Sequence, residues 1–210
     1  MKAVYADYAA ATPLRKEVLD AMMPYLTAEY GNPGSLNSFG RRARDALDEA
    51  RRVVAHCLNA KPTEVIFTGS GTESINLAIK GVARAYKDKG NHIITSTIEH
   101  HAVLHTCAYL QKHEGCKITY LKSDKQGMIN PEDLRKAITK ETILISISYA
   151  NNEVGSINNI AELAKIAHAQ KVLFHTDACQ AATYLSLDTQ ALGVDLMTLI
   201  GSKIYGPKGT

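Results

Sequence analysis

The stretch "HIITSTIEHHAVLHTCAYLQKHEGCKITYL" (residues 92–121) decides the fold. It opens with a short β-branched run at 92–96, continues with helical spacing at 102–113, and closes on a second β-branched run at 117–121. Two strand-like runs joined through a helix are typical of a β-α-β unit, in which the two strands are parallel. The stretch therefore predicts a parallel sheet.

The same alternation extends over most of the 210 residues. Further strands are predicted at "EVIFT" (64–68), "ILISIS" (143–148), "VLFHT" (172–176) and "DLMTL" (195–199). Helical patterns are present at 45–58, 75–86, 131–138 and 160–169, with Asn130 and Pro131 suited to the cap and first position of the third. This order predicts an α/β fold, with a mostly parallel sheet covered by helices on both faces.

The composition excludes several other classes of protein. A net charge of +3 with 45% hydrophobic and 21% charged residues is typical of a globular chain. The densest basic group, at 41–52, alternates with acids like a solvated helix face, so we expect no nucleic-acid partner. No apolar run approaches the ~20 residues that cross a bilayer, so we expect no membrane span. Four cysteines without CxxC spacing favour the cytoplasm.

Polar and glycine-rich segments follow the predicted strands. In parallel sheets, ligands bind beyond the carboxyl ends of the strands. Five segments are therefore expected to converge on one crevice: "TGSGTES" (68–74), "TIEHH" (97–101), "YANNEVG" (149–155), "HTDACQ" (175–180) and "IGSK" (200–203).

The first of these segments fits a phosphate group. Gly69 and Gly71 allow a ligand to approach the backbone closely, and Ser70 with Glu73 has capping-box spacing at a helix start. Backbone N–H groups at a helix N-terminus favour an anion. A plain strand-to-helix turn would use the same residues, so both interpretations stay open at this point. Because no Gly-Lys-Ser/Thr follows, the segment is not a nucleoside triphosphate loop.

Two charged residues follow the last two predicted strands. Asp177 comes after the run at 172–176, and an acid there usually has a cationic partner because an unpaired buried charge is costly. A structural salt bridge or a helix cap is the alternative. Lys203 comes after the run at 195–199, framed by glycine and proline. A desolvated lysine amine is a nucleophile toward carbonyl groups, whereas an ordinary surface lysine is the alternative.

Histidines follow the strand at 92–96. His100 could be a ligand-facing ring or an ordinary surface residue. His101 and His105 are four residues apart and could share a helix face, as zinc ligands do. No third ligand stands at a suitable spacing, so we expect no metal.

These parts together match the needs of pyridoxal 5'-phosphate (PLP). The cofactor carries a phosphate, a pyridine nitrogen that a carboxylate keeps protonated, an aldehyde that reacts with lysine, and a flat ring. The sequence offers the segment 68–74, Asp177, Lys203 and His100 for these four features. PLP is therefore the predicted cofactor.

The chain resembles the cysteine desulfurases of the NifS/IscS kind, in class V of the fold-type I PLP-dependent enzymes. The resemblance runs from residue 4 to residue 209. It is carried by "VYADYAAATP", "YGNPGSLNSFGRRAR", "EVIFTGSGTESINLAIKG", "HIITSTIEHHAVLHTC", "ISYANNEVGSI", "LFHTDACQA" and "GVDLMTLIGSKIYGPKG". It implies a fold-type I large domain that is incomplete at the C-terminus. Residues 1–14 would be an N-terminal arm belonging to the small domain, and residues 15–210 the PLP-binding large domain, ending just after the cofactor lysine.

The resemblance also implies roles for single residues. Lys203 would attach the cofactor, and His100 would stack on its ring and move protons; these are the expected catalytic residues. The remaining cofactor contacts would come from Asp177 at the pyridine nitrogen, Gln180 at the ring hydroxyl, Asn152 at the ring edge, and Gly71, Thr72 and Ser202 at the phosphate.

Three positions depart from the family pattern. Ile200 and Ser202 stand where family members commonly have serine and histidine, and Asn37 stands where they have histidine. Ile200 cannot donate a hydrogen bond to phosphate, whereas Ser202 can. We expect these departures to affect how tightly the phosphate is bound and the local geometry of the site.

The implied reaction converts L-cysteine to L-alanine and leaves the sulfur as an enzyme persulfide, for a sulfur acceptor or iron–sulfur scaffold protein. The enzyme would be a homodimer. In the family the nucleophilic cysteine lies beyond the lysine, so we expect an N-terminal portion without full turnover. Cys57, Cys107, Cys116 and Cys179 do not stand in that context. The alternatives are another class V enzyme, such as a selenocysteine lyase or an aminotransferase, and an inactive scaffold fragment.

Overall fold

The structure, a computed structural model, describes residues 3–210. The chain divides into two compact units. One unit comprises the residues up to Thr68 together with Gly201–Thr210, and the other comprises Gly69–Ile200. We call them unit 1 and unit 2 and describe each by itself.

Unit 2 is built on a five-stranded sheet in the order β2-β1-β3-β4-β5, and all of its pairings are parallel. The strands are β1 (His92–Ser96), β2 (Lys117–Leu121), β3 (Thr142–Ser146), β4 (Leu173–Asp177) and β5 (Leu196–Thr198). The register pairs Ile145 with Phe174 and Asp177 with Thr198. Because the strands are parallel, their carboxyl ends lie at one edge of the sheet.

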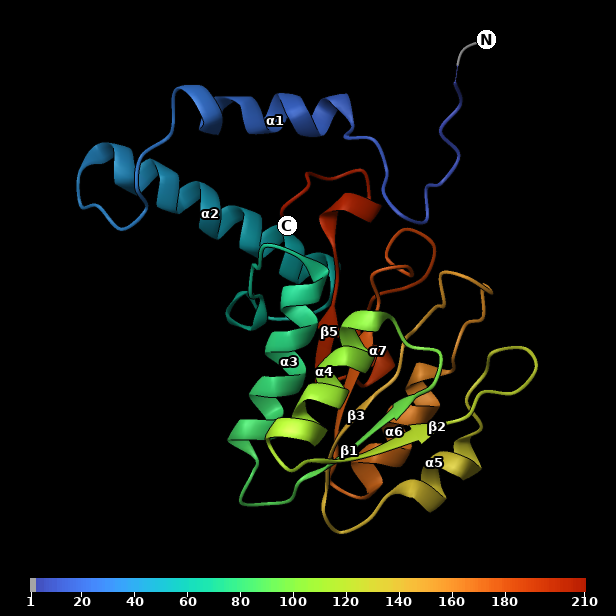
Figure 1. Cartoon of the computed structure of the whole chain (residues 1–210). Coiled ribbons are helices and arrows are strands. Elements are labelled where there is room, and N and C mark those ends of the chain that lie inside the picture. Colours follow the sequence, from blue (N-terminus) through green and yellow to red (C-terminus); the bar gives the residue numbers. More distant parts are fainter. Residues whose placement is uncertain (1–2) are drawn as a thin grey trace. The chain divides into compact units, whose positions relative to one another are not determined.

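Five helices complete unit 2, and helices lie on both sides of the sheet (Figure 1). They are α3 (Gly71–Ala85), α4 (His101–His113), α5 (Pro131–Ala137), α6 (Ile160–Ala169) and α7 (Thr189–Leu192). The predicted cap of α5 is confirmed, since the Asn130 side chain accepts the N–H of Glu132 at 2.9 Å and Pro131 is the first helical residue.

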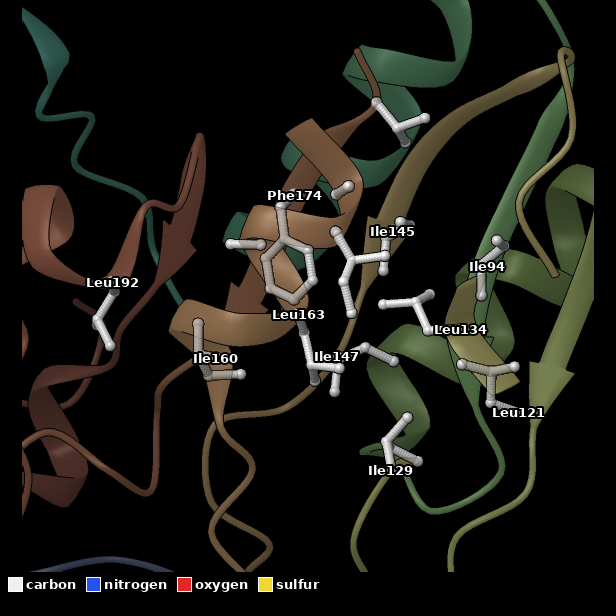
Figure 2. Packing of buried hydrophobic residues seen from close by; sticks show 14 residues of the cluster. Ile94, Leu121, Ile129, Leu134, Ile145, Ile147, Ile160, Leu163, Phe174 and Leu192 are labelled. Atoms are coloured by element: carbon white, nitrogen blue, oxygen red, sulfur yellow. The ribbon is translucent and has the colours of Figure 1, made fainter. Parts of the chain in front are cut away.

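Alternating strand residues fill two separate cores. Ile94 and Ile145 pack toward α5 and α6 in a cluster that also holds Phe174 and Leu163 (Figure 2). Ile93 and Leu144, their neighbours in sequence, join the cluster of α3 and α4. All five strand residues of β1 and of β3 are buried. This two-faced burial explains why their sequences are continuous apolar or small runs and do not alternate with charge.

Unit 1 contains α1 (Lys16–Thr27), α2 (Ser38–Cys57) and the short 3-10 helices η1 (Pro62–Glu64) and η2 (Gly201–Lys203). Thr12 joins its two sequence segments, because its N–H and hydroxyl both donate to the carbonyl of Ser202, at 2.8 and 3.0 Å. The Thr12 hydroxyl in turn accepts the N–H of Tyr205 at 2.8 Å. The C-terminal decapeptide is therefore anchored on residues near the start of the chain.

The sequence predictions hold for the strands and helices of unit 2, but the strand predicted at 64–68 is wrong. Glu64 ends η1, and the following residues are outside the five-stranded sheet. Ile66 is 69% exposed, and the Arg51 guanidinium donates to the carbonyl of Val65 and lies over the Phe67 ring. The carbonyl of Val65 is thus hydrogen-bonded to a side chain and not to a neighbouring strand.

No helix in the described part of the chain combines the length and the apolar character required to span a membrane.

Candidate active site

Asp177 is the last residue of β4 and lies at the edge where the strands end. It is 8% exposed, and its Oδ1 accepts the N–H of Cys179 at 3.0 Å. Its carbonyl accepts the N–H of Tyr149, which fixes the chain after β3 against the end of β4. A carboxylate is thus held in a largely buried place at the carboxyl end of a central strand.

Gly71 opens α3 beside this loop. A Cβ at Gly71 would lie 3.1 Å from Cys179 Sγ and 3.5 Å from Ile200 Cβ, so glycine permits a close approach there. Cys179, whose N–H bonds Asp177, therefore brings the acid and the start of α3 together. The N–H groups of Gly71 and Thr72 have no helical carbonyl one turn back, so they are available to an anion.

The cap of this helix differs slightly from the predicted capping box. Ser70 Oγ accepts the N–H of Glu73 at 3.1 Å, as expected. The Glu73 carboxylate, however, accepts the N–H of Gly69 at 2.6 Å, one residue before the cap. Ser74 Oγ and Thr198 Oγ1 lie 3.1 Å apart and tie the first turn of α3 to the end of β5. The helix start is thus fixed to the sheet.

His100 caps α4 at the end of the loop after β1. Its Nδ1 accepts the N–H of Ala102 at 3.1 Å. In the neutral ring this bond leaves the proton on Nε2, which can then act as a donor. His100 and Thr72 line one cavity of about 430 Å³ between α3 and α4, so the structure brings these two predicted residues together.

The His101 and His105 rings lie 5.3 Å apart in the same cavity lining. No group of three or more His, Cys, Asp or Glu side chains that could hold a metal is found among the described residues. Lys80 and Tyr109 also line this cavity, and Lys80 Nζ lies 4.5 Å from the centroid of the Tyr109 ring.

The other predicted residues lie in loops or in the short 3-10 helix η2. Asn152 follows β3, is exposed, and donates to Glu153 Oε1 at 2.7 Å. Gln180 is half-buried, three residues after Asp177. Ser202 and Lys203 belong to unit 1, where both lie half-buried in η2. Lys203 follows the end of β5 by five residues in the sequence.

Two buried titratable residues were not predicted from the sequence as part of the site. His175 on β4 bonds Ser146 Oγ at 2.8 Å and Thr198 Oγ1 at 3.0 Å, and burial lowers the pKa of this imidazole to about 4. Glu99 is 6% exposed, and burial raises the pKa of its carboxyl to about 7. Neither residue carries a local signal in the sequence, because the burial of each depends on partners from other strands or the loops after them.

The donor set fits the groups of PLP. The close approach at Gly71 provides a helix start for a phosphate, and Asp177 provides a buried carboxylate for a ring nitrogen. His100 adds a ring whose Nε2 is left as a donor by the bond at Nδ1. All three lie in unit 2.

Residues 4–210 match the family model described as aminotransferase class-V. The chain belongs to the aminotransferase class-V family. Among its relatives are proteins named "Cysteine desulfurase IscS" from Dictyoglomus turgidum, 54% identical over 98% of this chain, and from Methanosarcina thermophila, 52% identical over 99%. The class-V chain covers 52% and 51% of these two relatives, so it spans about half their length.

Solved structures agree with this family assignment. The structure titled "SspA in complex with cysteine" has a TM-score of 0.94 and 40% identity, and it is matched over 98% of this chain and 59% of its own. A "NifS-like protein" has a TM-score of 0.95 and 37% identity, matched over 98% and 57%. The expected resemblance and the fold-type I large-domain fold are confirmed for this class-V chain.

Proposed function

We propose that this class-V chain is the N-terminal portion of a PLP-dependent cysteine desulfurase, which converts L-cysteine to L-alanine and passes the sulfur to an enzyme cysteine. One observation carries the proposal. The buried carboxylate of Asp177 and the open start of α3 at Gly71 meet through Cys179, in a chain about half identical to proteins named cysteine desulfurase.

This arrangement, together with the resemblance, supports the proposed cofactor contacts. Asp177 holds a proton on the pyridine nitrogen, and the N–H groups of Gly71 and Thr72 bind the phosphate. Gln180 bonds the ring hydroxyl. His100 covers the ring and carries a proton at Nε2, the nitrogen left free by its bond to Ala102.

The remaining assignments rest on the resemblance. Asn152 lines the ring edge, and Ser202 adds a phosphate donor in place of the serine that Ile200 replaces. Lys203 attaches the cofactor covalently. When bound, PLP supplies an electron sink that stabilises negative charge at the substrate α-carbon.

We also propose the wider setting. Residues 1–14 form an arm of the small domain, and residues 15–210 form the large domain. The active enzyme is a cytoplasmic homodimer that delivers sulfur to an acceptor or iron–sulfur scaffold protein. The apolar side chains of α1 support self-association, since no residue of that helix is buried and Leu26 is 63% exposed.

The test uses the complete reading frame that carries these residues. With PLP, L-cysteine and a thiol reductant, we expect alanine and sulfide to form in equal amounts. Lys203→Ala should reduce both rates by at least about 1,000-fold, because a covalent anchor and nucleophile is lost. The matched variant Lys125→Ala, at an exposed turn, should keep them. Release of pyruvate in place of alanine, or unchanged rates in Lys203→Ala, would refute the proposal.

A further inference from the structure

Glu99 lies where two loops of the candidate site meet. Its Oε1 accepts a hydrogen bond from Ser96 Oγ at 2.6 Å and another from the N–H of Ser148 at 3.0 Å. Ser96 ends β1, and Ser148 follows the end of β3 by two residues. One carboxyl oxygen thus joins the loop that carries His100 to the loop that carries Asn152.

A second hydrogen bond strengthens this junction. Asn151 Nδ2 donates to the carbonyl of Ile98 at 2.9 Å. The Asn151 Oδ1 also accepts the N–H groups of Glu153 and Val154, at 2.8 and 3.0 Å, and so shapes its own loop. Glu99 directly precedes His100, and Asn151 directly precedes Asn152. The contacts of Glu99 and Asn151 therefore hold together the two loops that carry His100 and Asn152.

The other carboxyl oxygen of Glu99 is in a different situation. Oε2 is buried and has no hydrogen-bond partner among the described residues. An ionised carboxylate would leave a buried charge with one oxygen unsatisfied, which is costly. A proton on Oε2 removes that charge and leaves both Oε1 bonds intact.

The surrounding charges act in the same direction. Burial is the main cause that raises the pKa of Glu99 to about 7; the hydrogen bonds from Ser96 and Ser148 lower this pKa, and the negative charge of Asp177 on β4 raises it. From α4, the thiol of Cys107 faces the same carboxyl; burial and the Glu99 charge raise the pKa of this thiol to about 12, so the thiol is neutral. No cationic group contributes to the pKa of Glu99 in the described part of the chain.

We propose that Glu99 is a positioning residue that works in its protonated form, docking the His100 loop on the loop after β3 and leaving Asp177 as the carboxylate charge at the cofactor ring. The inference rests on the proposed function for its link to PLP. Loss of the proton would place a second negative charge near Asp177 and an uncompensated charge inside the loop junction.

The test compares wild type with Glu99→Gln, a permanently neutral side chain of the same shape, and with Glu99→Ala, which lacks both Oε1 bonds. Glu132→Gln, at an exposed helix position, is the matched control. The first measurement uses the full chain without cofactor, by urea unfolding between pH 5 and pH 8. The second is the dissociation constant of PLP over the same range, from the change in cofactor fluorescence.

The sign follows from proton linkage. With a pKa of about 7 in the folded chain and ~4.3 unfolded, the folded state holds more protons, so rising pH favours unfolding. The unfolding constant of wild type should rise relative to Glu99→Gln by roughly 50–100-fold from pH 5 to pH 8. Over the same range, the affinity of wild type for PLP should fall about 10-fold relative to that of Glu99→Gln. The reason is that Glu99 loses its proton above pH 7 and only its protonated form docks the two loops. Glu132→Gln should follow wild type in both measurements.

Parallel pH curves for wild type and Glu99→Gln in either measurement would overturn the inference. Glu99→Ala should bind PLP weakly at every pH, and recovery of binding in Glu99→Gln would separate positioning from general loss of packing. If no variant binds PLP while the unfolding constants still diverge, the proposed function fails and the docking of the two loops by neutral Glu99 is supported.

Discussion

Phe174→Ala is expected to lower the free energy of unfolding of unit 2 by about 3–5 kcal/mol. Phe174 is the second residue of β4, is fully buried, and belongs to the cluster that packs α5 and α6 on the sheet (Figure 2). Removing the ring loses its burial and leaves a cavity that strands on either side cannot close, because β3 and β5 are hydrogen-bonded to β4. The measurement is urea denaturation followed by far-UV circular dichroism.

Phe39→Ala is the matched control. This phenylalanine is 54% exposed at the start of α2, so its loss should cost less than about 1 kcal/mol. A similar small loss for Phe174→Ala would contradict the described core. Because β4 also carries Asp177, the same variant should weaken cofactor binding indirectly, and the two effects are separated by measuring binding well below the unfolding midpoint.

Asp177→Asn is expected to weaken PLP binding by about 10- to 100-fold, the range for losing a hydrogen bond to a charged partner of roughly 1.5–3 kcal/mol. Asparagine keeps the size of the side chain and the oxygen that accepts the Cys179 N–H, so the change removes mainly the charge. Fluorescence titration with PLP gives the dissociation constant.

Asp133→Asn, at an exposed position of α5, is the control for this change and should leave the constant unaltered. Equal affinities in wild type and Asp177→Asn would show that this carboxylate does not face the pyridine nitrogen. The stability of Asp177→Asn should stay near that of wild type, since the backbone bonds of residue 177 are unaffected.

The sequence predicted the sheet of unit 2 well for a physical reason. Strands buried on both faces must be short apolar runs, and the crossover helices between them must show a 3.6-residue period. The run at 64–68 is as rich in β-branched and apolar residues as the true strands. A strand also needs a hydrogen-bonded neighbour, however, and composition does not show whether a neighbour is present. Helix α1 was missed because its apolar side chains are exposed and form no buried stripe.

Candidate site residues could be predicted from the sequence where polar side chains stand at the carboxyl ends of strands. Asp177 ends β4 and His100 follows β1, so both stand out at the edge where ligands bind. Gly71 stands out for its glycine-rich helix start, although the strand predicted before it is absent. Glu99 did not stand out, since beside a pair of histidines it resembles a surface acid. Its burial depends on Ser96 and Ser148, which come together only when β1 and β3 pair. Contacts between residues 49 positions apart leave no local signal.

The central claim is that PLP is attached to Lys203, and borohydride reduction of the cofactor-loaded protein followed by peptide mass spectrometry tests it most directly. Reduction fixes a pyridoxyl group on the lysine that holds the cofactor. We expect the label on Lys203 and none on Lys208, the exposed lysine five residues further along the same segment. A label on Lys208 or another lysine, or no label at all, would contradict the account.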